Sequence, residues 1–482
     1  MGRLHQRTLF SAACLLALAA SAWAQAGKAD QEIKHPWHGD FKDDYKDPKT
    51  KALVMHYRMR VPDKLPEQKT LGLIVCFHGM NGNEDHVTGF AMEAAKRCGF
   101  VDQYVITGGK SKGPGWATND DKDLLAWIAW IQSTYPIDPR RVHIIGMSNG
   151  GWMVKRFGWE HQDLFASVSP YCGGGVDFSG MPKGQKAPPN QGPMSPAETK
   201  TEWYFVHGDA DEQVGVDASR RACEQLKQKG YRYVYREIAG ADHGGILKYP
   251  DVSEDNLRFI HALRHKEIPL SKDEKAAVTS LAGKARNEKA EGMAPVVAEA
   301  SRIGGLPGGK VIGNALDSSD PKVKESAAAT AESTLYGREM VLEMVKLLKD
   351  KSEEVKAAGF KGLATFSNWR YEEAQATLIR LARTKSAPAD DRVSAIQGLG
   401  KTVKLMLLGN FEDKLILWSL VLLLDDDDAK VREAAFEPLK KGVKDTFGYA
   451  PDLPTSERKI SVGKWKSWTQ TKAGPLEGTA NK

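Results

Sequence analysis

A serine between two glycines is the residue of this sequence whose setting most resembles that of a nucleophile. Ser148 lies in Gly146-Met147-Ser148-Asn149-Gly150, between the apolar β-branched segment 141–146 and a segment with helical spacing of its large residues. A strand, tight turn and helix of this kind lift a serine oxygen above the carboxyl edge of a parallel sheet. The glycines are needed there because the helix passes close to a strained backbone. The sequence therefore predicts that Ser148 is a nucleophile.

A serine nucleophile needs a histidine to take its proton and an acid to orient that histidine, because the hydroxyl alone is weakly reactive at neutral pH. The segment 201–208 reads as a strand that ends in an acidic turn, and 231–238 reads as a strand that ends near His243. The order serine, acid, histidine is typical of one large hydrolase fold. The acidic turn offers three candidates, Asp209, Asp211 and Glu212.

Stabilisation of an oxyanion needs two backbone N–H groups that point at the same place. Asn149, the residue after the nucleophile, is expected to supply one. The glycine-rich turn after the apolar segment 71–79 is expected to supply the other, from Met80 or alternatively from Gly79. The side chain of Asn149 either suits the strained backbone or contacts the substrate, and the sequence leaves both open.

Tryptophans near the predicted nucleophile are candidates for a substrate pocket. Trp152 and Trp159 follow Ser148 at helical spacing, which is more typical of core residues. Trp116 lies on a polar loop and is the better candidate. We therefore assign Trp116 and Trp152 to the candidate pocket.

No metal or cofactor site is expected. The sequence has no H-E-x-x-H and no close cysteine pair of the zinc type. The acidic run at 422–431 lacks the alternating oxygen ligands and the glycine of a calcium loop, so a solvated turn and helix start is expected there. His78 and His207 are expected to be structural hydrogen-bonding residues rather than bases.

Residues 50–265 alternate continuous apolar runs with helical patterns, which predicts an α/β domain with a mostly parallel sheet and helices on both faces. Between 176 and 199 the chain is rich in proline and glycine, which predicts a long irregular loop: either a lid or binding loop, or a surface insertion without function. The predicted strands are 71–79, 104–107, 141–146, 201–208 and 231–238, and the predicted helices are 91–99, 121–135 and 220–230.

After residue 266 the composition changes to alanine, lysine, glutamate and leucine, and a degenerate repeat appears. Each unit has an acidic stretch, a valine and a helical pattern with small residues. This pattern resembles a short HEAT-type α-solenoid, predicted for 316–445, in which paired helices stack because neither buries its apolar face alone. We expect a linker or irregular helical cap at 266–315 and a tail at 446–482, where Trp465 and Trp468 either dock a partner or pack on the last repeat. The repeated valines are Val323, Val355, Val393 and Val431.

The N-terminus has the pattern of a signal peptide: a basic start, an apolar core and a small-residue cleavage site ending at Ala24. We predict export to the periplasm or beyond the cell, with residues 1–24 removed and 25–49 as an N-terminal extension. The apolar run at 415–424 is too short to span a membrane and is expected to be a buried helix. The cysteines beyond the signal peptide either form up to two disulfides or are buried. They are Cys76, Cys98, Cys172 and Cys223.

Length and composition exclude several classes of protein. At 482 residues, with 41% hydrophobic and 27% charged residues, the chain is an ordinary folded protein of more than one domain. Its net charge of +6, to which the predicted signal peptide contributes two arginines, is too small to indicate nucleic-acid binding.

Four motifs in order, HGMNGN, GMSNGG, HGDADEQV and AGADHGG, resemble those of secreted esterases grouped with polyhydroxybutyrate depolymerases and feruloyl or acetylxylan esterases. The resemblance covers about 50–265 and implies an α/β-hydrolase fold with Ser148 as nucleophile, Asp211 as acid and His243 as base. Many members of that group have an aromatic residue and a proline after the histidine, whereas this chain has Gly244-Gly245-Ile246. The acyl-binding edge is therefore expected to differ.

Together these features predict an exported serine hydrolase that cleaves carboxylic esters through an acyl-enzyme and without a cofactor. The sequence leaves open whether the ester is a small molecule or a polymer. A serine peptidase on the same fold is one alternative, because fold does not fix function. A non-catalytic scaffold that works through the helical repeats is the other. The repeats either bind a protein or polymer partner, form an oligomer, or cover the active site, and the sequence leaves these alternatives open.

Overall fold

The computed structural model describes residues 38–66, 70–175, 201–238, 240–265, 268–333, 339–368, 371–406, 414–443 and 445–473. These residues form two compact units. The first contains the β-sheet and extends to about Lys275, and the second contains the helices from Ala276 onward. The predicted signal peptide and the predicted loop at 176–199 lie outside the described residues.

The first unit is built on an eight-stranded sheet with the order β1-β2-β4-β3-β5-β6-β7-β8. From β4 to β7 each neighbouring pair is parallel, whereas β1 and β2 pair antiparallel with each other and β2 pairs antiparallel with β4. The strands are β1 (Gly39–Lys46), β2 (Leu53–Val61), β3 (Leu71–Phe77), β4 (Tyr104–Gly109), β5 (Ile137–Met147), β6 (Ser167–Tyr171), β7 (Glu202–Gly208) and β8 (Tyr233–Ile238).

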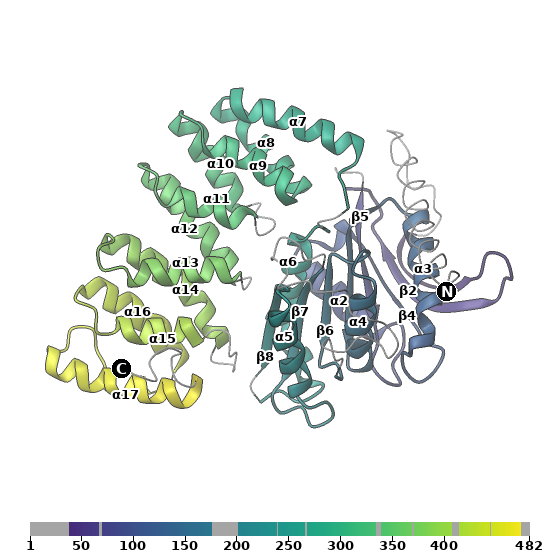
Figure 1. The fold of residues 1–482 in the computed structure, drawn as a ribbon, viewed down its shortest axis with the longest axis horizontal. Helices are drawn as coiled ribbons and strands as arrows, with labels where there is room; N and C mark the ends of the chain where they lie inside the picture. Colours follow the sequence, from purple (N-terminus) through teal and green to yellow (C-terminus); the bar gives the residue numbers. More distant parts are fainter. Residues whose placement is uncertain are drawn as a thin grey trace, which may run out of the picture. The chain divides into compact units, whose positions relative to one another are not determined.

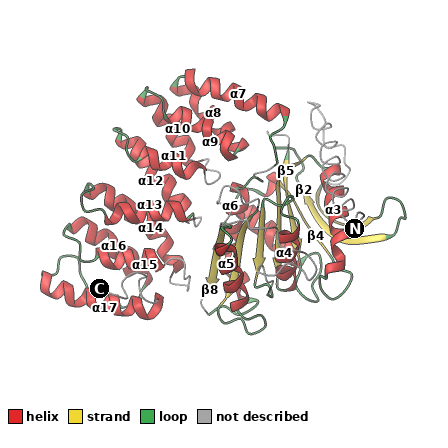
Figure 2. Ribbon diagram, viewed as in Figure 1, coloured by secondary structure: helices red, strands yellow, loops and turns green. Residues whose placement is uncertain are grey.

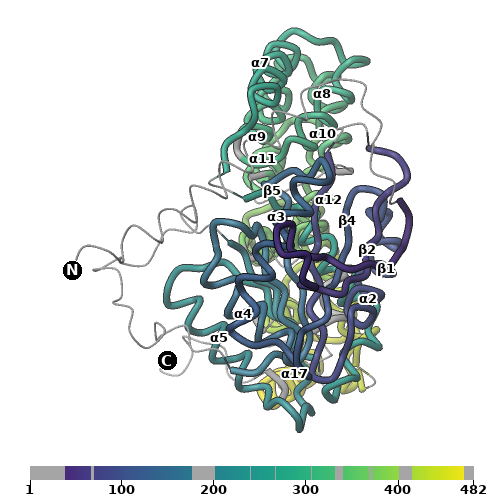
Figure 3. The backbone as a smooth tube through the Cα atoms, turned by 90° about the vertical axis from the view of Figure 1, so that its right-hand side faces the viewer, coloured from purple at the N-terminus to yellow at the C-terminus, as the bar shows by residue number. Residues whose placement is uncertain are grey.

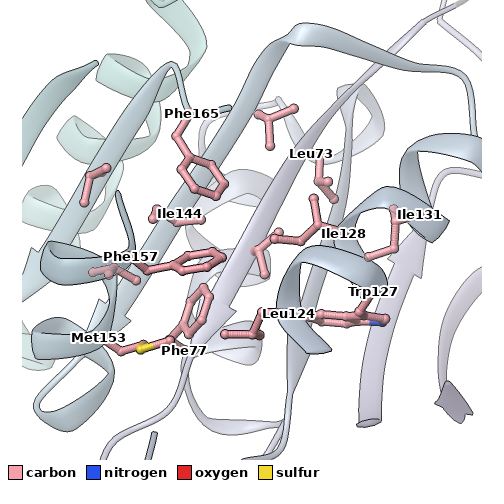
Figure 4. Close-up of a cluster of buried hydrophobic side chains, with 14 of the residues drawn as sticks. Leu73, Phe77, Leu124, Trp127, Ile128, Ile131, Ile144, Met153, Phe157 and Phe165 are labelled. Carbon is pink, nitrogen blue, oxygen red and sulfur yellow. The ribbon is translucent and has the colours of Figure 1, made fainter. Parts of the chain in front are cut away.

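Helices cover both faces of this sheet (Figure 1). On one face α3 (Asp121–Thr134), α4 (Asn149–Glu160) and α5 (Asp217–Gln228) bury their apolar sides against the strands. On the other, α2 (His86–Arg97) and α6 (Pro250–Ala262) pack together and against the sheet. Figure 4 shows part of the core under α3 and α4, where Trp127, Phe157 and strand residues such as Ile144 meet. The predicted α/β class with a mostly parallel sheet is confirmed.

The predicted start of this domain at residue 50 is wrong. Strand β1 lies before it and pairs along its length with β2, so residues 39–46 belong to the sheet and not to an extension. The sequence GDFKDDYK in β1 is largely charged and exposed, which is why no apolar run indicated a strand. Strands β2 and β6 and helix α6 were also not predicted.

From Ala276 onward, the described residues of the second unit form helices joined by turns and loops, without a strand (Figure 2). Figures 1 and 3 show its helices following one another in chain order. They are α7 (Lys272–Asn287), α8 (Ala290–Ile303), α9 (Gly305–Leu316), α10 (Pro321–Ser333), α11 (Glu339–Leu347), α12 (Glu353–Asn368), α13 (Glu372–Arg383), α14 (Ala389–Met406), α15 (Lys414–Leu423), α16 (Ala429–Gly442) and α17 (Thr455–Ala473).

The four repeated valines take equivalent places in this unit. Each lies in the first turns of a helix, and those helices, α10, α12, α14 and α16, pack on one another in that order. The acidic run before α16 behaves as predicted at a helix start, since the Asp428 carboxylate accepts the N–H groups of Lys430 and Val431. Assignment of these helices to the HEAT type stays a prediction.

Two predictions for the flanks of the repeats are corrected. Residues 266–315 contain the regular helices α7, α8 and most of α9 rather than an irregular cap. Residues 446–482 contain α17 rather than only a tail, and α17 packs on α15. Trp465 is fully buried and lies against Phe447 and Trp468, so the packing interpretation of the tryptophan pair holds.

The four described cysteines are free, and Cys76, Cys172 and Cys223 are buried. The sequence left open whether these cysteines form disulfides or are buried, and in the structure they form no disulfide. Among the described helices, none is both long and apolar enough to span a membrane.

Candidate active site

The strand, turn and helix around Ser148 have the geometry of a strained elbow. Ser148 follows β5, precedes α4 and has φ 58° and ψ −117°, a backbone conformation that few non-glycine residues adopt. Its N–H donates to the carbonyl of Tyr171 at the end of β6, at 2.9 Å. A Cβ on Gly150 would lie 2.1 Å from the carbonyl oxygen of Phe77, and one on Gly146 would lie 2.2 Å from that of Gly150. Both glycines are thus required by close approach of backbone.

The structure brings His243 and one of the three candidate acids together. Nδ1 of His243 lies 2.7 Å from Oδ2 of Asp211. The other oxygen of Asp211 accepts the backbone N–H groups of Gln213 at 3.0 Å and Val214 at 2.8 Å. Asp211 is buried, whereas Asp209 and Glu212 are exposed. The carboxylate that orients His243 in this structure therefore belongs to Asp211, and its own orientation is fixed by the turn.

A second histidine supports this acidic turn. His207 is fully buried, with Nδ1 2.7 Å from the Ser219 hydroxyl and Nε2 2.8 Å from the Val214 carbonyl oxygen. Because a carbonyl only accepts, Nε2 carries the proton, and Ser219 donates to Nδ1. Burial lowers the pKa of His207, which keeps it neutral. His207 thus has the structural role expected for it.

Cys172 links the Ser148 elbow to the His243 loop. Its thiol donates to the carbonyl of His243 at 3.5 Å and also interacts with the Ser148 N–H. Residue 172 follows β6 with φ 38°, so a strained backbone places its side chain there. Burial raises the pKa of Cys172 to about 12, which keeps the thiol protonated and a poor nucleophile.

Two groups of described side chains have ligand atoms close enough together for a metal ion. Cys172, Asp211 and His243 form one group, and Asp121, Glu160 and His161 form the other, each within 4.8 Å. In the first, the Asp211 carboxylate pairs with His243, and the Cys172 thiol donates to the His243 carbonyl. In the second, both carboxylates pair with Arg156. Side chains of both groups thus already have hydrogen-bond or ion-pair partners in the protein.

The loop after β3 forms the other side of the Ser148 elbow. A Cβ on Gly79 would lie 3.2 Å from Cβ and 3.8 Å from Oγ of Ser148, so the Gly79-Met80 backbone borders the serine. The Met80 side chain is 55% exposed. His78 is buried, its Nε2 accepts the N–H of Ser111 at 3.0 Å, and its Nδ1 lies 2.7 Å from the Gly79 carbonyl oxygen. Nδ1 therefore donates to Gly79, and burial lowers the pKa of His78 so that this neutral form persists.

Trp116, a candidate pocket residue, is almost entirely buried. It is 3% exposed, its ring packs on Phe77 and His78, and its Nε1 donates to the His78 carbonyl at 3.1 Å. Trp116 therefore packs beneath the loop after β3, and its assignment to a substrate pocket stays a prediction. Trp152, on α4, is half-buried against the core with the guanidinium of Arg156 over its ring, and it offers part of its surface to solvent.

A fully buried lysine that sequence reasoning missed lies two turns along α4 from Ser148. Nζ of Lys155 donates to the Gly173 carbonyl at 2.8 Å, next to Cys172. Burial lowers the pKa of Lys155 to about 7. The helical spacing of 152, 155, 156 and 159 showed that residue 155 lies on a helix, but not that it faces inward.

This burial predicts a pH dependence of stability. Unfolding returns Lys155 to water, where it binds a proton up to about pH 10.5, so the unfolded state holds more protons between about pH 7 and 10.5. The free energy of unfolding should therefore rise across this window, at up to about 1.4 kcal/mol per pH unit. Lys155→Met should remove that rise and stabilise the protein most at pH 6, measured by denaturant unfolding from pH 6 to 10. An unchanged slope in Lys155→Met, equal to that of the exposed control Lys227→Met, would contradict the assignment.

Comparisons with known proteins give one family match and several distant structures. Residues 114–176, which include Trp116 and the Ser148 elbow, match the prolyl oligopeptidase family. No curated protein matches the chain. A solved thermostable esterase is similar at 23% identity and a TM-score of 0.38, over 47% of this chain and 63% of that one.

Two further structures are similar over comparable shares of the chain. Est1E from Butyrivibrio proteoclasticus is 15% identical with a TM-score of 0.33, over 46% of this chain and 98% of that one. An acylaminoacyl peptidase is 15% identical with a TM-score of 0.35, over 49% of this chain and 44% of that one. The chain thus spans less than two thirds of the thermostable esterase and less than half of the peptidase.

Proposed function

We propose that this protein is an exported serine hydrolase of the α/β-hydrolase fold that cleaves carboxylic esters. Ser148 attacks the ester carbonyl and passes its proton to Nε2 of His243, which returns it to the departing alcohol. Asp211 holds the imidazole by Nδ1 and stabilises the imidazolium. Water then attacks the acyl-enzyme by the same route in reverse, and no cofactor takes part.

The observation that carries this proposal is the conjunction of a strained serine with an oriented histidine. The strained backbone at Ser148 costs free energy, and so does burying the carboxylate that binds the His243 imidazole. Cys172 connects the two features, because its thiol contacts both the His243 carbonyl and the Ser148 N–H. Backbone N–H groups of Asn149 and Met80 are the proposed donors to the oxyanion. In this proposal they donate to the oxygen of the substrate carbonyl as it gains negative charge, where fixed donors act most strongly.

A serine peptidase is the second candidate, and the match of residues 114–176 to the prolyl oligopeptidase family favours it. Esters remain the first choice because the four motifs around the proposed triad resemble the esterase group. The helical repeats are proposed to be a HEAT-like solenoid that binds a polymeric substrate or a protein partner.

The test compares ester and amide substrates with the same acyl group. We expect the purified protein to hydrolyse p-nitrophenyl esters from acetate to octanoate, or methyl ferulate, and to leave the matching p-nitroanilides and short peptides largely intact. Faster turnover of the anilides and peptides than of the esters would overturn the ester assignment in favour of the peptidase. Turnover of neither class by the folded protein would leave the scaffold alternative.

A further inference from the structure

The side chain of Asn149 is bound to the backbone of a distant loop. Its Oδ1 accepts the N–H of Trp116 at 2.5 Å, and its Nδ2 donates to the Trp116 carbonyl at 3.3 Å. One amide thus satisfies both polar groups of one residue, as a neighbouring strand would do. The amide is turned toward Trp116, which answers the question that the sequence left open about this side chain.

The loop held in this way lies against the proposed oxyanion turn. The N–H of Asn81, which has φ 58°, donates to the Pro114 carbonyl at 2.5 Å. The Trp116 indole donates to the His78 carbonyl at 3.1 Å. Residues 78 and 81, which flank Met80 and Gly79, are therefore each bound to the segment 111–117.

The approach is close enough to leave no room for a side chain between the two loops. A Cβ on Gly115 would lie 2.6 Å from Oδ1 of Asn149 and 2.9 Å from Sδ of Met80. The residue before Trp116 therefore contacts both residues that are proposed to supply oxyanion donors. Movement of the segment 111–117 would change the position of one donor relative to the other.

We propose that the Asn149 side chain is a positioning residue, which sets the geometry of the oxyanion hole by holding the segment 111–117 against the turn at 78–82. This inference rests on the proposed function, since it assigns a role within the same site. Asn149 thus acts twice: its backbone N–H donates to the oxyanion, and its side chain fixes the place of the Met80 N–H. A misplacement of a catalytic group by about 1 Å can cost about 100-fold in rate.

The activity test separates positioning from substrate contact. Asn149→Ala keeps the backbone N–H but frees Trp116, so kcat for an ester should fall about 10- to 100-fold while KM stays within about threefold. Trp116→Phe removes the indole donor to His78 and should lower kcat less. The double variant should lose less than the product of the two single losses, because both changes release the same segment. Asn119→Ala, an exposed residue beside the same segment, should match the wild type.

A higher KM with unchanged kcat in Asn149→Ala would overturn the inference, because the side chain would then contact substrate. Independent, fully multiplicative losses in the double variant would also overturn it.

Hydrogen–deuterium exchange tests the clamp without reference to activity. In Asn149→Ala, peptides that cover 111–117 and 78–82 should both exchange faster than in the wild type and in Asn119→Ala. Unchanged exchange at 78–82 would overturn the inference even if the ester assignment holds. Absence of esterase activity in the wild-type protein would contradict the proposed function. The exchange result would still decide whether the Asn149 side chain holds the segments 111–117 and 78–82.

Discussion

Ser148→Ala is expected to reduce ester hydrolysis by about 10⁴-fold or more. The remaining rate should be the one that substrate binding and the oxyanion hole support without a nucleophile. The oxygen that attacks the carbonyl is lost, and water cannot take its place in the same geometry. The change removes one oxygen from a partly buried side chain. Among the described residues that hydroxyl has no recorded hydrogen bond to lose, so the folded state should be retained. Initial rates with a p-nitrophenyl ester and a thermal melt of the same sample measure both.

The control for this variant is Ser133→Ala, an exposed serine on α3. Its activity should equal that of the wild type. Activity of Ser148→Ala within about tenfold of the wild type, in a protein that melts normally, would contradict the assignment of the nucleophile.

Asp211→Asn is expected to lower kcat by about 10³- to 10⁴-fold. The carboxylate accepts the proton on Nδ1 of His243, which leaves Nε2 free to act as a base. An amide nitrogen at that place favours the tautomer with Nδ1 unprotonated and Nε2 protonated, which cannot accept the serine proton. The two backbone N–H groups bound to Oδ1 would keep an acceptor in the variant, so the turn should stay in place.

Asp209→Asn is the matched control, two residues away on the same turn and exposed. It should keep kcat within about twofold of the wild type. The reverse result, a large loss in Asp209→Asn with little loss in Asp211→Asn, would show that the acid had been assigned to the wrong residue.

The sequence allowed the α/β domain to be predicted where strands are continuously apolar. Strands β3, β5 and β7 are buried on both faces, so their residue types alone indicate a parallel sheet. The charged edge strand β1 has no such signal, because most of its side chains are exposed to water. Its assignment as a strand depends on its pairing with β2, which its own residues do not indicate. Helix α17 has no clear apolar face in its sequence, so its residues alone do not indicate a helix. In the structure it packs on α15.

Side-chain orientation limited the prediction of the site in the same way. The chain order of serine, acid and histidine can be predicted because the topology of the fold dictates it, whereas the choice of Asp211 over Asp209 needed either a family motif or the observed contact. No sequence pattern indicated that Trp116 faces inward, that Asn149 binds its backbone, or that Lys155 is buried. Each of these depends on a contact between segments that are far apart in the chain.

Covalent trapping of the nucleophile tests the central claim most directly. The purified protein should react with a fluorophosphonate in a one-to-one ratio, and peptide mass spectrometry should place the adduct on Ser148, with prior addition of an ester substrate slowing the reaction. An adduct on another residue, or no adduct in a folded protein, would contradict the claim that Ser148 forms the acyl-enzyme.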